Sequence, residues 1–160
     1  MDRPGLIILL TELEADCAVA ADAARKAVLR LPEQTDGHLE ACAYELARFY
    51  NILQKMLERI CEGFENHFEK RGDYHEKLIQ RLSLDLRGMR PAFIPQGRAA
   101  QVRELKGFRH VMRHAYDLTL RADRLADLTQ VADQLAHELP RWCAEFEQKV
   151  RAEQGWEPGE

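Results

Sequence analysis

The stretch LIILLTELEADCAVAADAARKAVLRLP, residues 6–32, decides the fold class. Its apolar residues recur at alternating spacings of four and three, which is the repeat of one face of an α-helix. These residues are Leu6, Leu10, Leu13, Cys17, Ala20, Ala24, Ala27 and Leu31. Pro32 ends the predicted helix. Its alanine-rich face permits close packing, either against another helix of this chain or against a second copy.

The rest of the chain repeats the helical period, which predicts four more helices. The second begins at Thr35 or Asp36 and ends at a C-cap, Gly72. The remaining three helices are expected over residues 73–88, 98–118 and 123–152. In the first of these, Asp73 and Glu76 make a start that resembles a capping box. Pro140 should bend or interrupt the last one. The segment RPAFIPQGR, residues 90–98, is predicted to be a turn.

Five helices with short connections predict an all-α fold, an antiparallel helical bundle. Trp142 and Phe146 are expected in its core, as are five residues of the fourth helix: Val102, Leu105, Phe108, Val111 and Ala115. We expect a single domain over residues 1–153 and a flexible C-terminal tail over residues 154–160.

The composition is that of a globular domain, with 46% hydrophobic and 31% charged residues in 160 positions. The net charge of −4 argues against a surface coated for nucleic acid, so a nucleic-acid site requires a local basic patch. No segment approaches the length of a membrane span, which predicts a cytoplasmic protein without a membrane partner. The four cysteines show no paired spacing and are interpreted as buried, reduced thiols: Cys17, Cys42, Cys61 and Cys143.

The stretch GFRHVMRHAYDL, residues 107–118, lies in the only strong local basic patch. From residue 98 to residue 116 five basic side chains stand against one acidic side chain, Glu104. The basic residues are Arg98, Arg103, Lys106, Arg109 and Arg113. On a continuous helix Arg109, Arg113 and Tyr116 form one stripe, and His110, His114 and Asp117 form a second stripe about 100° away.

Arg109 and His114 lie about 140° apart on a regular helix, because five residues separate them. One helix therefore cannot easily direct both side chains at the same atom. Two such helices that meet in a cleft could do so, with each helix supplying part of the site.

Several chemistries compete for these residues. His110, His114 and Asp117 could ligate a metal, although Val111 stands where a zinc-protease helix carries glutamate. Nucleophilic catalysis by serine has little support, because the only serine, Ser83, falls in an apolar helix. A phosphate-binding glycine loop is absent. A solvated basic helix face, without any ligand, is the remaining alternative.

Cleavage of RNA fits the residue types best. A histidine can take the proton of a 2′-hydroxyl or protonate the leaving oxygen. An arginine offers a planar fork of donors to the phosphoryl oxygens as charge develops. Neither role needs a metal or another cofactor. The product would carry a 2′,3′-cyclic phosphate, and the 2′-hydroxyl would select RNA over DNA.

Taken as R-x4-H-x-Y, residues 109–116 resemble the signature of HepT toxins, small helical ribonucleases of the HEPN superfamily. The flanking sequences YHEKLIQRLSLDLRGMRPAFIP and ELKGFRHVMRHAYDL also resemble HepT-like domains, over about two-thirds of the chain. His110 stands where better-known members often carry asparagine, and Arg113 is an additional cation.

This resemblance implies an endoribonuclease toxin of a toxin–antitoxin system, with Arg109 and His114 as the catalytic pair. His110, Arg113, Lys106 and Arg103 are expected to support the site or bind RNA. The family works as a homodimer with two motifs in one basic cleft. The resemblance also implies that an MNT-type nucleotidyltransferase antitoxin modifies Tyr116 by AMPylation.

A second interpretation keeps the family but not the activity, because some members are non-catalytic helical partners that bind substrate for a nucleotidyltransferase. Two acidic residues, Glu40 and Glu45, are candidates for an acidic helper on the second helix. Four further histidines are interpreted as surface or capping residues: His38, His67, His75 and His137. Without the resemblance, Tyr116 would be a rim tyrosine that packs its ring.

Overall fold

A computed structural model describes residues 1–65, 70–115 and 117–156 of the chain. The described residues form five α-helices and no β-strand, which confirms the predicted all-α class. The helices are α1 (Arg3–Arg30), α2 (Asp36–Phe64), α3 (Tyr74–Leu82), α4 (Ala99–His114) and α5 (Ala122–Gln154). None of them combines the length and the apolar character that crossing a bilayer requires.

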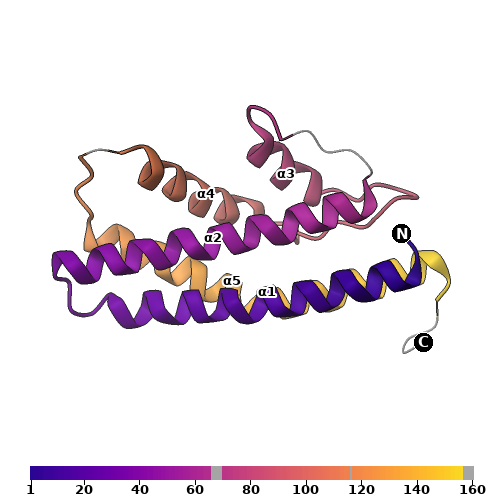
Figure 1. The fold of residues 1–160 in the computed structure, drawn as a ribbon, viewed down its shortest axis with the longest axis horizontal. Coiled ribbons are helices and arrows are strands. Elements are labelled where there is room, and N and C mark those ends of the chain that lie inside the picture. Colours follow the sequence, from indigo (N-terminus) through magenta and orange to yellow (C-terminus); the bar gives the residue numbers. More distant parts are fainter. Residues whose placement is uncertain (66–69, 116, 157–160) are drawn as a thin grey trace.

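The three long helices pack against one another, and the two short helices lie on α2. Helices α1 and α2 form an antiparallel hairpin, and α5 packs along both of them (Figure 1). Helices α3 and α4 lie on the side of α2 that faces away from α1 (Figure 1). The basic stretch therefore sits on an outer helix, which the α2 surface supports from below.

The core follows the predicted helical periodicity. Six of the eight stripe residues of α1 are buried, whereas Leu10 and Leu31 are only partly buried. The predicted core residues Trp142 and Phe146 are each 1% exposed. Both rings meet Phe93 edge-to-face, with centroids 6.0 and 5.7 Å apart. Such aromatic contacts tie the turn segment to α5.

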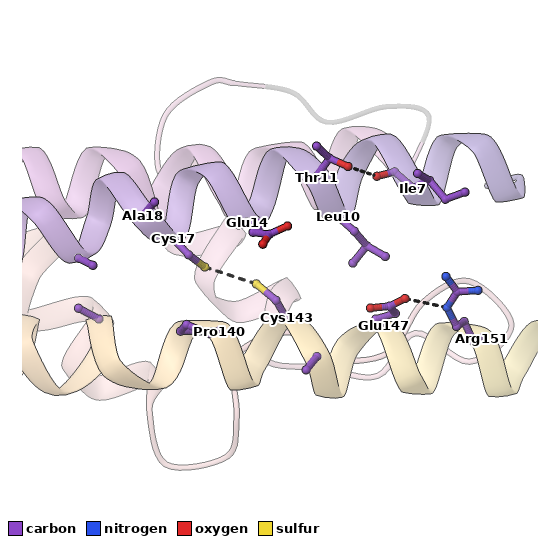
Figure 2. Close-up of a pocket in the computed structure, with 13 residues that line it drawn as sticks. Ile7, Leu10, Thr11, Glu14, Cys17, Ala18, Pro140, Cys143, Glu147 and Arg151 are labelled. Atoms are coloured by element: carbon purple, nitrogen blue, oxygen red, sulfur yellow. Dashed lines mark hydrogen bonds and ion pairs between the residues drawn. The ribbon is translucent and has the colours of Figure 1, made fainter. Parts of the chain in front are cut away.

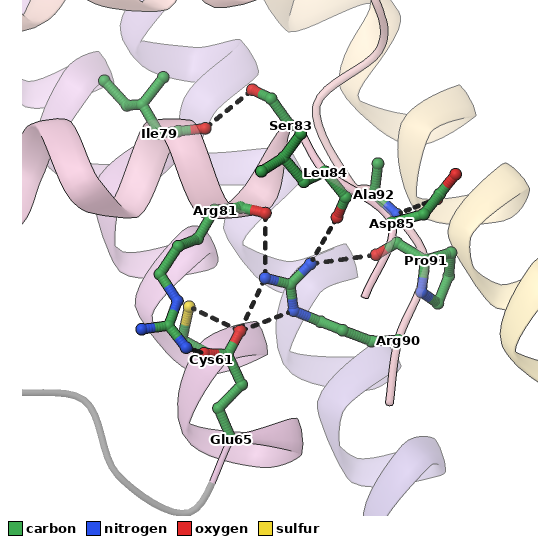
Figure 3. A network of polar contacts seen from close by, with 10 residues as sticks. All are labelled: Cys61, Glu65, Ile79, Arg81, Ser83, Leu84, Asp85, Arg90, Pro91 and Ala92. Atoms are coloured by element: carbon green, nitrogen blue, oxygen red, sulfur yellow. Dashed lines mark hydrogen bonds and ion pairs between the residues drawn. The ribbon is translucent and has the colours of Figure 1, made fainter. Parts of the chain in front are cut away.

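The expected C-cap of the second helix at Gly72 is wrong, because α2 ends at Phe64. Glu65 has extended backbone and its side chain is almost fully buried. Its carboxylate accepts hydrogen bonds from the fully buried guanidinium of Arg90, 2.7 Å from Nη2 and 2.9 Å from Nε, and from Arg81 (Figure 3). The buried ion pair therefore joins the end of α2 to the turn segment.

The third helix is also shorter than predicted and ends at Leu82 instead of Gly88. The backbone N–H groups of Phe93 and Ile94 donate to the Leu82 carbonyl at 2.8 and 2.9 Å. Both side chains are buried, so the chain doubles back onto the end of α3. The predicted turn is therefore packed against the core.

Three expectations for α4 and α5 are corrected. Helix α4 ends at His114 instead of Leu118, and its expected inward residues Val111 and Ala115 are exposed. Only the first half of α4 lies tightly on the core, through Val102 and Leu105. Helix α5 contains Pro140 within its bounds, so the expected interruption does not occur, because the apolar face stays buried on both sides of the proline. The expected bend at Pro140 stays a prediction.

Part of the predicted tail belongs to the folded structure. Gly155 adopts a left-handed conformation that caps α5, and the Trp156 ring lies 5.7 Å from the Arg3 guanidinium. Residues 157–160 lie outside the described part of the chain.

Candidate functional site

Helix α4 carries the candidate site on the positions beside and opposite its anchoring face. Val102 and Leu105 are fully buried and anchor the helix, and Phe108 and Met112 are partly buried against the same core. The intervening positions carry the basic side chains, of which Lys106 and Arg109 are half-buried and the others are exposed. The helical period thus separates an anchoring face from a cationic face.

Three cations of the basic patch are already paired with carboxylates. Arg103 Nε and Lys106 Nζ donate to Glu76 of α3 at 2.7 and 2.5 Å. Arg98 makes a two-point contact with Glu138 of α5. The hydrogen bond from Lys106, with that from Arg103, holds the pKa of Glu76 below its usual range. These pairs attach α4 to its neighbours and reduce the charge that is available to a ligand.

Arg109 differs from these neighbours on the same helix. Its side chain is half-buried, and among the described residues it has no hydrogen bond or ion pair. Its guanidinium carbon lies 6.0 Å from the centroid of the Tyr50 ring, and Tyr50 is 1% exposed. A cation over an aromatic face keeps its N–H donors available. Within the described part of the chain, Arg109 is thus oriented by a ring and not by an anion.

Polar atoms without partners gather around Arg109 at the junction of α2, α3 and α4. Four of them are Tyr50 Oη, Gln54 Oε1, His75 Nδ1 and Arg109 Nε, all shielded from solvent and all without a hydrogen-bond partner in the described structure. Burial lowers the pKa of His75, and the nearby cations Arg109, Lys106 and Arg113 lower it further. Burial also raises the pKa of the Tyr50 hydroxyl. The junction therefore favours a neutral imidazole beside a cation.

The interpretation of His75 as a surface or capping residue missed this environment. His75 lies on α3, and its ring stacks on the Tyr74 ring with centroids 3.9 Å apart. The Tyr74 hydroxyl in turn accepts a hydrogen bond from Gln54 Nε2 at 2.8 Å. Only the packing of α3 against α2 and α4 brings these groups to Arg109, and no spacing in the sequence signals it.

His110 and His114 lie together at the C-terminal end of α4. Both side chains are exposed, and their ring centroids are 4.5 Å apart. Because α4 ends at His114, Asp117 does not continue their stripe. No group of three metal-ligating side chains occurs among the described residues. Tyr116, the predicted modification site, lies outside the described residues.

Arg109 and His114 do not converge within one chain. They are five positions apart on a helix, and the described structure has no hydrogen bond between them. Of the other cations in the predicted site, Arg103 and Lys106 are paired with Glu76, whereas Arg113 is exposed. A single copy thus presents an arginine and a histidine on different faces of α4.

The two acidic candidates on α2 have different surroundings. Glu45 is buried and accepts a hydrogen bond from Arg48 at 2.7 Å, so it serves an ion pair that also reaches Asp22 on α1. Glu40 is exposed and lines a shallow recess with Met112 and Ala115 at the end of α4. Of the two, only Glu40 lies beside the histidine end of the candidate site.

A family model described as HepT-like protein matches residues 41–150. The match includes most of α2, all of α3 and α4, and most of α5. It therefore covers the helix that carries Arg109 and His114 and the helices that pack against it. No curated protein and no solved structure matches the chain.

Proposed function

Because this chain belongs to the HepT-like family, we propose that it is a metal-independent endoribonuclease toxin of a toxin–antitoxin system. In this proposal Arg109 binds the scissile phosphate and His114 transfers protons. An MNT-type nucleotidyltransferase antitoxin silences the enzyme by AMPylation of Tyr116. The proposed substrate is RNA, and the working form is a homodimer.

The proposal rests chiefly on the state of Arg109. Arg98, Arg103 and Lys106 of the same patch all contact carboxylates, whereas Arg109 has no such partner among the described residues. A half-buried guanidinium that lies on an aromatic ring can donate two parallel hydrogen bonds to a phosphoryl group. Its partly desolvated position would strengthen that interaction over one at a fully exposed site.

His114 supplies the second proposed role. Its exposed ring at the end of α4 can reach a bound RNA without rearrangement of the core. As a general base it would take the proton of the 2′-hydroxyl, and the resulting alkoxide would attack the adjacent phosphorus. The P–O5′ bond breaks, and the leaving oxygen takes a proton. The products are a 2′,3′-cyclic phosphate and a free 5′-hydroxyl.

The proposed dimer brings the arginine of one copy near the histidine of the other. Val111 and Leu118 are large apolar side chains with 46% and 40% exposure, and both flank the candidate site. Exposed apolar residues beside a charged site suit contact with a second copy. We therefore place the dimer contact on this side of α4.

The proposed off-switch acts by charge and bulk. Tyr116 follows His114 by two positions, so an attached nucleotide would stand at the proposed RNA path. Its phosphate would oppose the phosphates of RNA and attract the arginines of the patch. Inhibition would require no change in the fold.

A growth assay tests the toxin proposal. Expression of the chain alone should arrest growth, and either His114→Ala or Arg109→Ala should relieve the arrest. Arg141→Ala on α5, which removes an exposed arginine, and His137→Ala serve as matched controls and should leave the arrest intact.

Purified protein should cleave RNA in the presence of EDTA and leave 2′,3′-cyclic phosphate ends. The loss of His114 should reduce the rate by about 10²- to 10⁴-fold, the usual contribution of a general acid or base. Equal cleavage by the His114→Ala variant would contradict the assignment. If the wild-type protein neither cleaves RNA nor arrests growth, the ribonuclease proposal fails, and the second interpretation, a non-catalytic partner of a nucleotidyltransferase, is the one to test.

A further inference from the structure

Two of the four cysteines meet where α1 packs against α5. Cys17 of α1 and Cys143 of α5 are 126 positions apart in sequence, and their Sγ atoms are 3.7 Å apart (Figure 2). One thiol donates a hydrogen bond to the other sulfur. The sequence predicts four buried, reduced thiols, whereas Cys143 is only half-buried, and no spacing in the sequence signals this contact.

Solvent reaches this pair through a groove between the two helices. The groove has a volume of about 630 Å³, and both cysteines line it. The lining of the groove includes the small or compact residues Ala18, Ala21, Ala136 and Pro140, and also the carboxylate of Glu14. Cys17 is 8% exposed and Cys143 is half-buried, so a small solute can approach without opening the core.

The hydrogen bond makes the two thiols chemically unequal. It lowers the pKa of Cys17, since the neighbouring S–H group stabilises a Cys17 thiolate. It raises the pKa of Cys143, as does burial. A thiolate is the reactive form of cysteine towards peroxides. Cys17 is thus suited to react first, and Cys143 is positioned to react second.

The other two cysteines have no such arrangement and provide an internal comparison. Cys42 and Cys61 are completely buried, and burial raises the pKa of both thiols. Their sulfurs contact oxygens, Thr129 Oγ1 at 3.4 Å and Glu65 Oε1 at 3.7 Å.

We propose that Cys17 and Cys143 form an oxidation site at which hydrogen peroxide converts the two thiols into an intramolecular disulfide that joins α1 to α5. The proposal does not depend on the ribonuclease proposal, because neither cysteine lies on α4.

The chemistry proceeds in two balanced steps. The Cys17 thiolate attacks one peroxide oxygen, the O–O bond breaks, and the products are a sulfenic acid and hydroxide, which takes up the proton lost by Cys17 to give water. The Cys143 sulfur then attacks the Cys17 sulfur. The S–S bond forms, the S–O bond breaks, and the Cys143 proton leaves with the hydroxyl group as a second water. Peroxide gains two electrons, and the two thiols lose them.

The geometry permits the second step with small side-chain movements. The sulfurs must approach by about 1.7 Å to reach the bond length of a disulfide. Both cysteines line the groove, so each side chain borders open space into which it can rotate about its Cα–Cβ bond. The bridge would join the first helix to the last and reduce the freedom of the unfolded chain.

The test uses the full chain, first reduced and then treated with increasing hydrogen peroxide. The intact mass should fall by two hydrogen atoms, and a non-reducing peptide map should contain one cross-linked pair that includes Cys17 and Cys143. The thermal midpoint should rise on oxidation, and dithiothreitol should reverse both changes.

Two variants sharpen the result. In Cys143→Ser the intact mass should no longer fall, and Cys17 should remain as a sulfenic acid that dimedone traps. Cys42→Ala should form the bridge as the wild type does. Three results would each overturn the proposal. They are oxidation of Cys42 or Cys61 before Cys17, a disulfide between two chains, and an intact mass that does not fall by two hydrogen atoms. Should Cys143→Ser fail to fold, the peptide map of the wild type decides the question alone.

Discussion

At the scale of the residue, the site depends on how Tyr50 presents Arg109. The ring supplies a face for the guanidinium, while the buried hydroxyl has no hydrogen-bond partner in the described structure. The ring and the hydroxyl therefore make separable contributions. The first orients a cation, and the second carries a desolvation cost in the folded state.

Tyr50→Phe should leave growth arrest unchanged and should alter the free energy of unfolding by less than about 1 kcal/mol, because the ring remains and an unpaired hydroxyl is removed. Tyr50→Leu should remove the aromatic face and relieve the arrest while the circular dichroism spectrum stays helical. Growth assays and urea unfolding measure the two effects. An active Tyr50→Leu variant would show that Arg109 needs no ring.

His75 provides a second prediction at this scale. Its pKa is lowered by burial and then by Arg109, Lys106 and Arg113, while Glu58 opposes them. Arg109→Gln should therefore raise the pKa of His75, which an NMR titration of the imidazole protons can measure. Arg87→Gln, at an exposed position outside this group, is the control and should leave the titration unchanged.

The same shift has a consequence for stability. A histidine whose folded pKa is lowered is protonated more readily in the unfolded chain, so stability falls as the pH drops below about 6.5. His75→Gln should remove this part of the pH dependence. An unchanged slope in chemical unfolding between pH 5 and 6.5 would show that His75 contributes none of it.

At the scale of the element, regular helices were predictable and their ends were not. The period of four and three in residues 6–31 places α1 correctly, because burial of one face follows from local spacing. Helix α2 ends at Phe64, and the next residue, Glu65, binds Arg90, which lies 25 positions further on and which no local pattern connects to it. The candidate site likewise has a part that local spacing predicts and a part that it does not. The stripe with Arg109 was visible in the sequence, whereas Tyr50 and His75 join it only through packing.

The Glu65–Arg90 pair gives the prediction at this scale. Glu65→Leu should cost about 3–5 kcal/mol of unfolding free energy, because it leaves the fully buried Arg90 guanidinium without its carboxylate. Arg90→Met should cost less, since Glu65 retains Arg81. Urea unfolding measures both, with Arg87→Met as an exposed control. A smaller cost for Glu65→Leu than for Arg90→Met would contradict this order.

At the scale of the whole molecule, the arrangement of α4 determines what one copy can do. Helix α4 lies on the outside of the bundle and ends at His114, with Arg109 directed towards α2 and α3 and the two histidines exposed. The proposed reaction needs a guanidinium and an imidazole on one phosphodiester. A second copy related by twofold symmetry would supply the missing group to each site, so each proposed site is shared between two chains.

Mixing two inactive variants tests this sharing. In a dimer of one Arg109→Ala chain and one His114→Ala chain, one shared site loses both groups and the other keeps both. Random exchange of the two variants should therefore restore about a quarter of wild-type RNA cleavage, because half of the dimers are mixed and each has one intact site. Each variant alone should stay inactive, and mixing either one with a doubly substituted chain is the matched control. If the mixture stays inactive while native mass spectrometry shows mixed dimers, Arg109 and His114 act within one chain, and α4 must deform to bring them together.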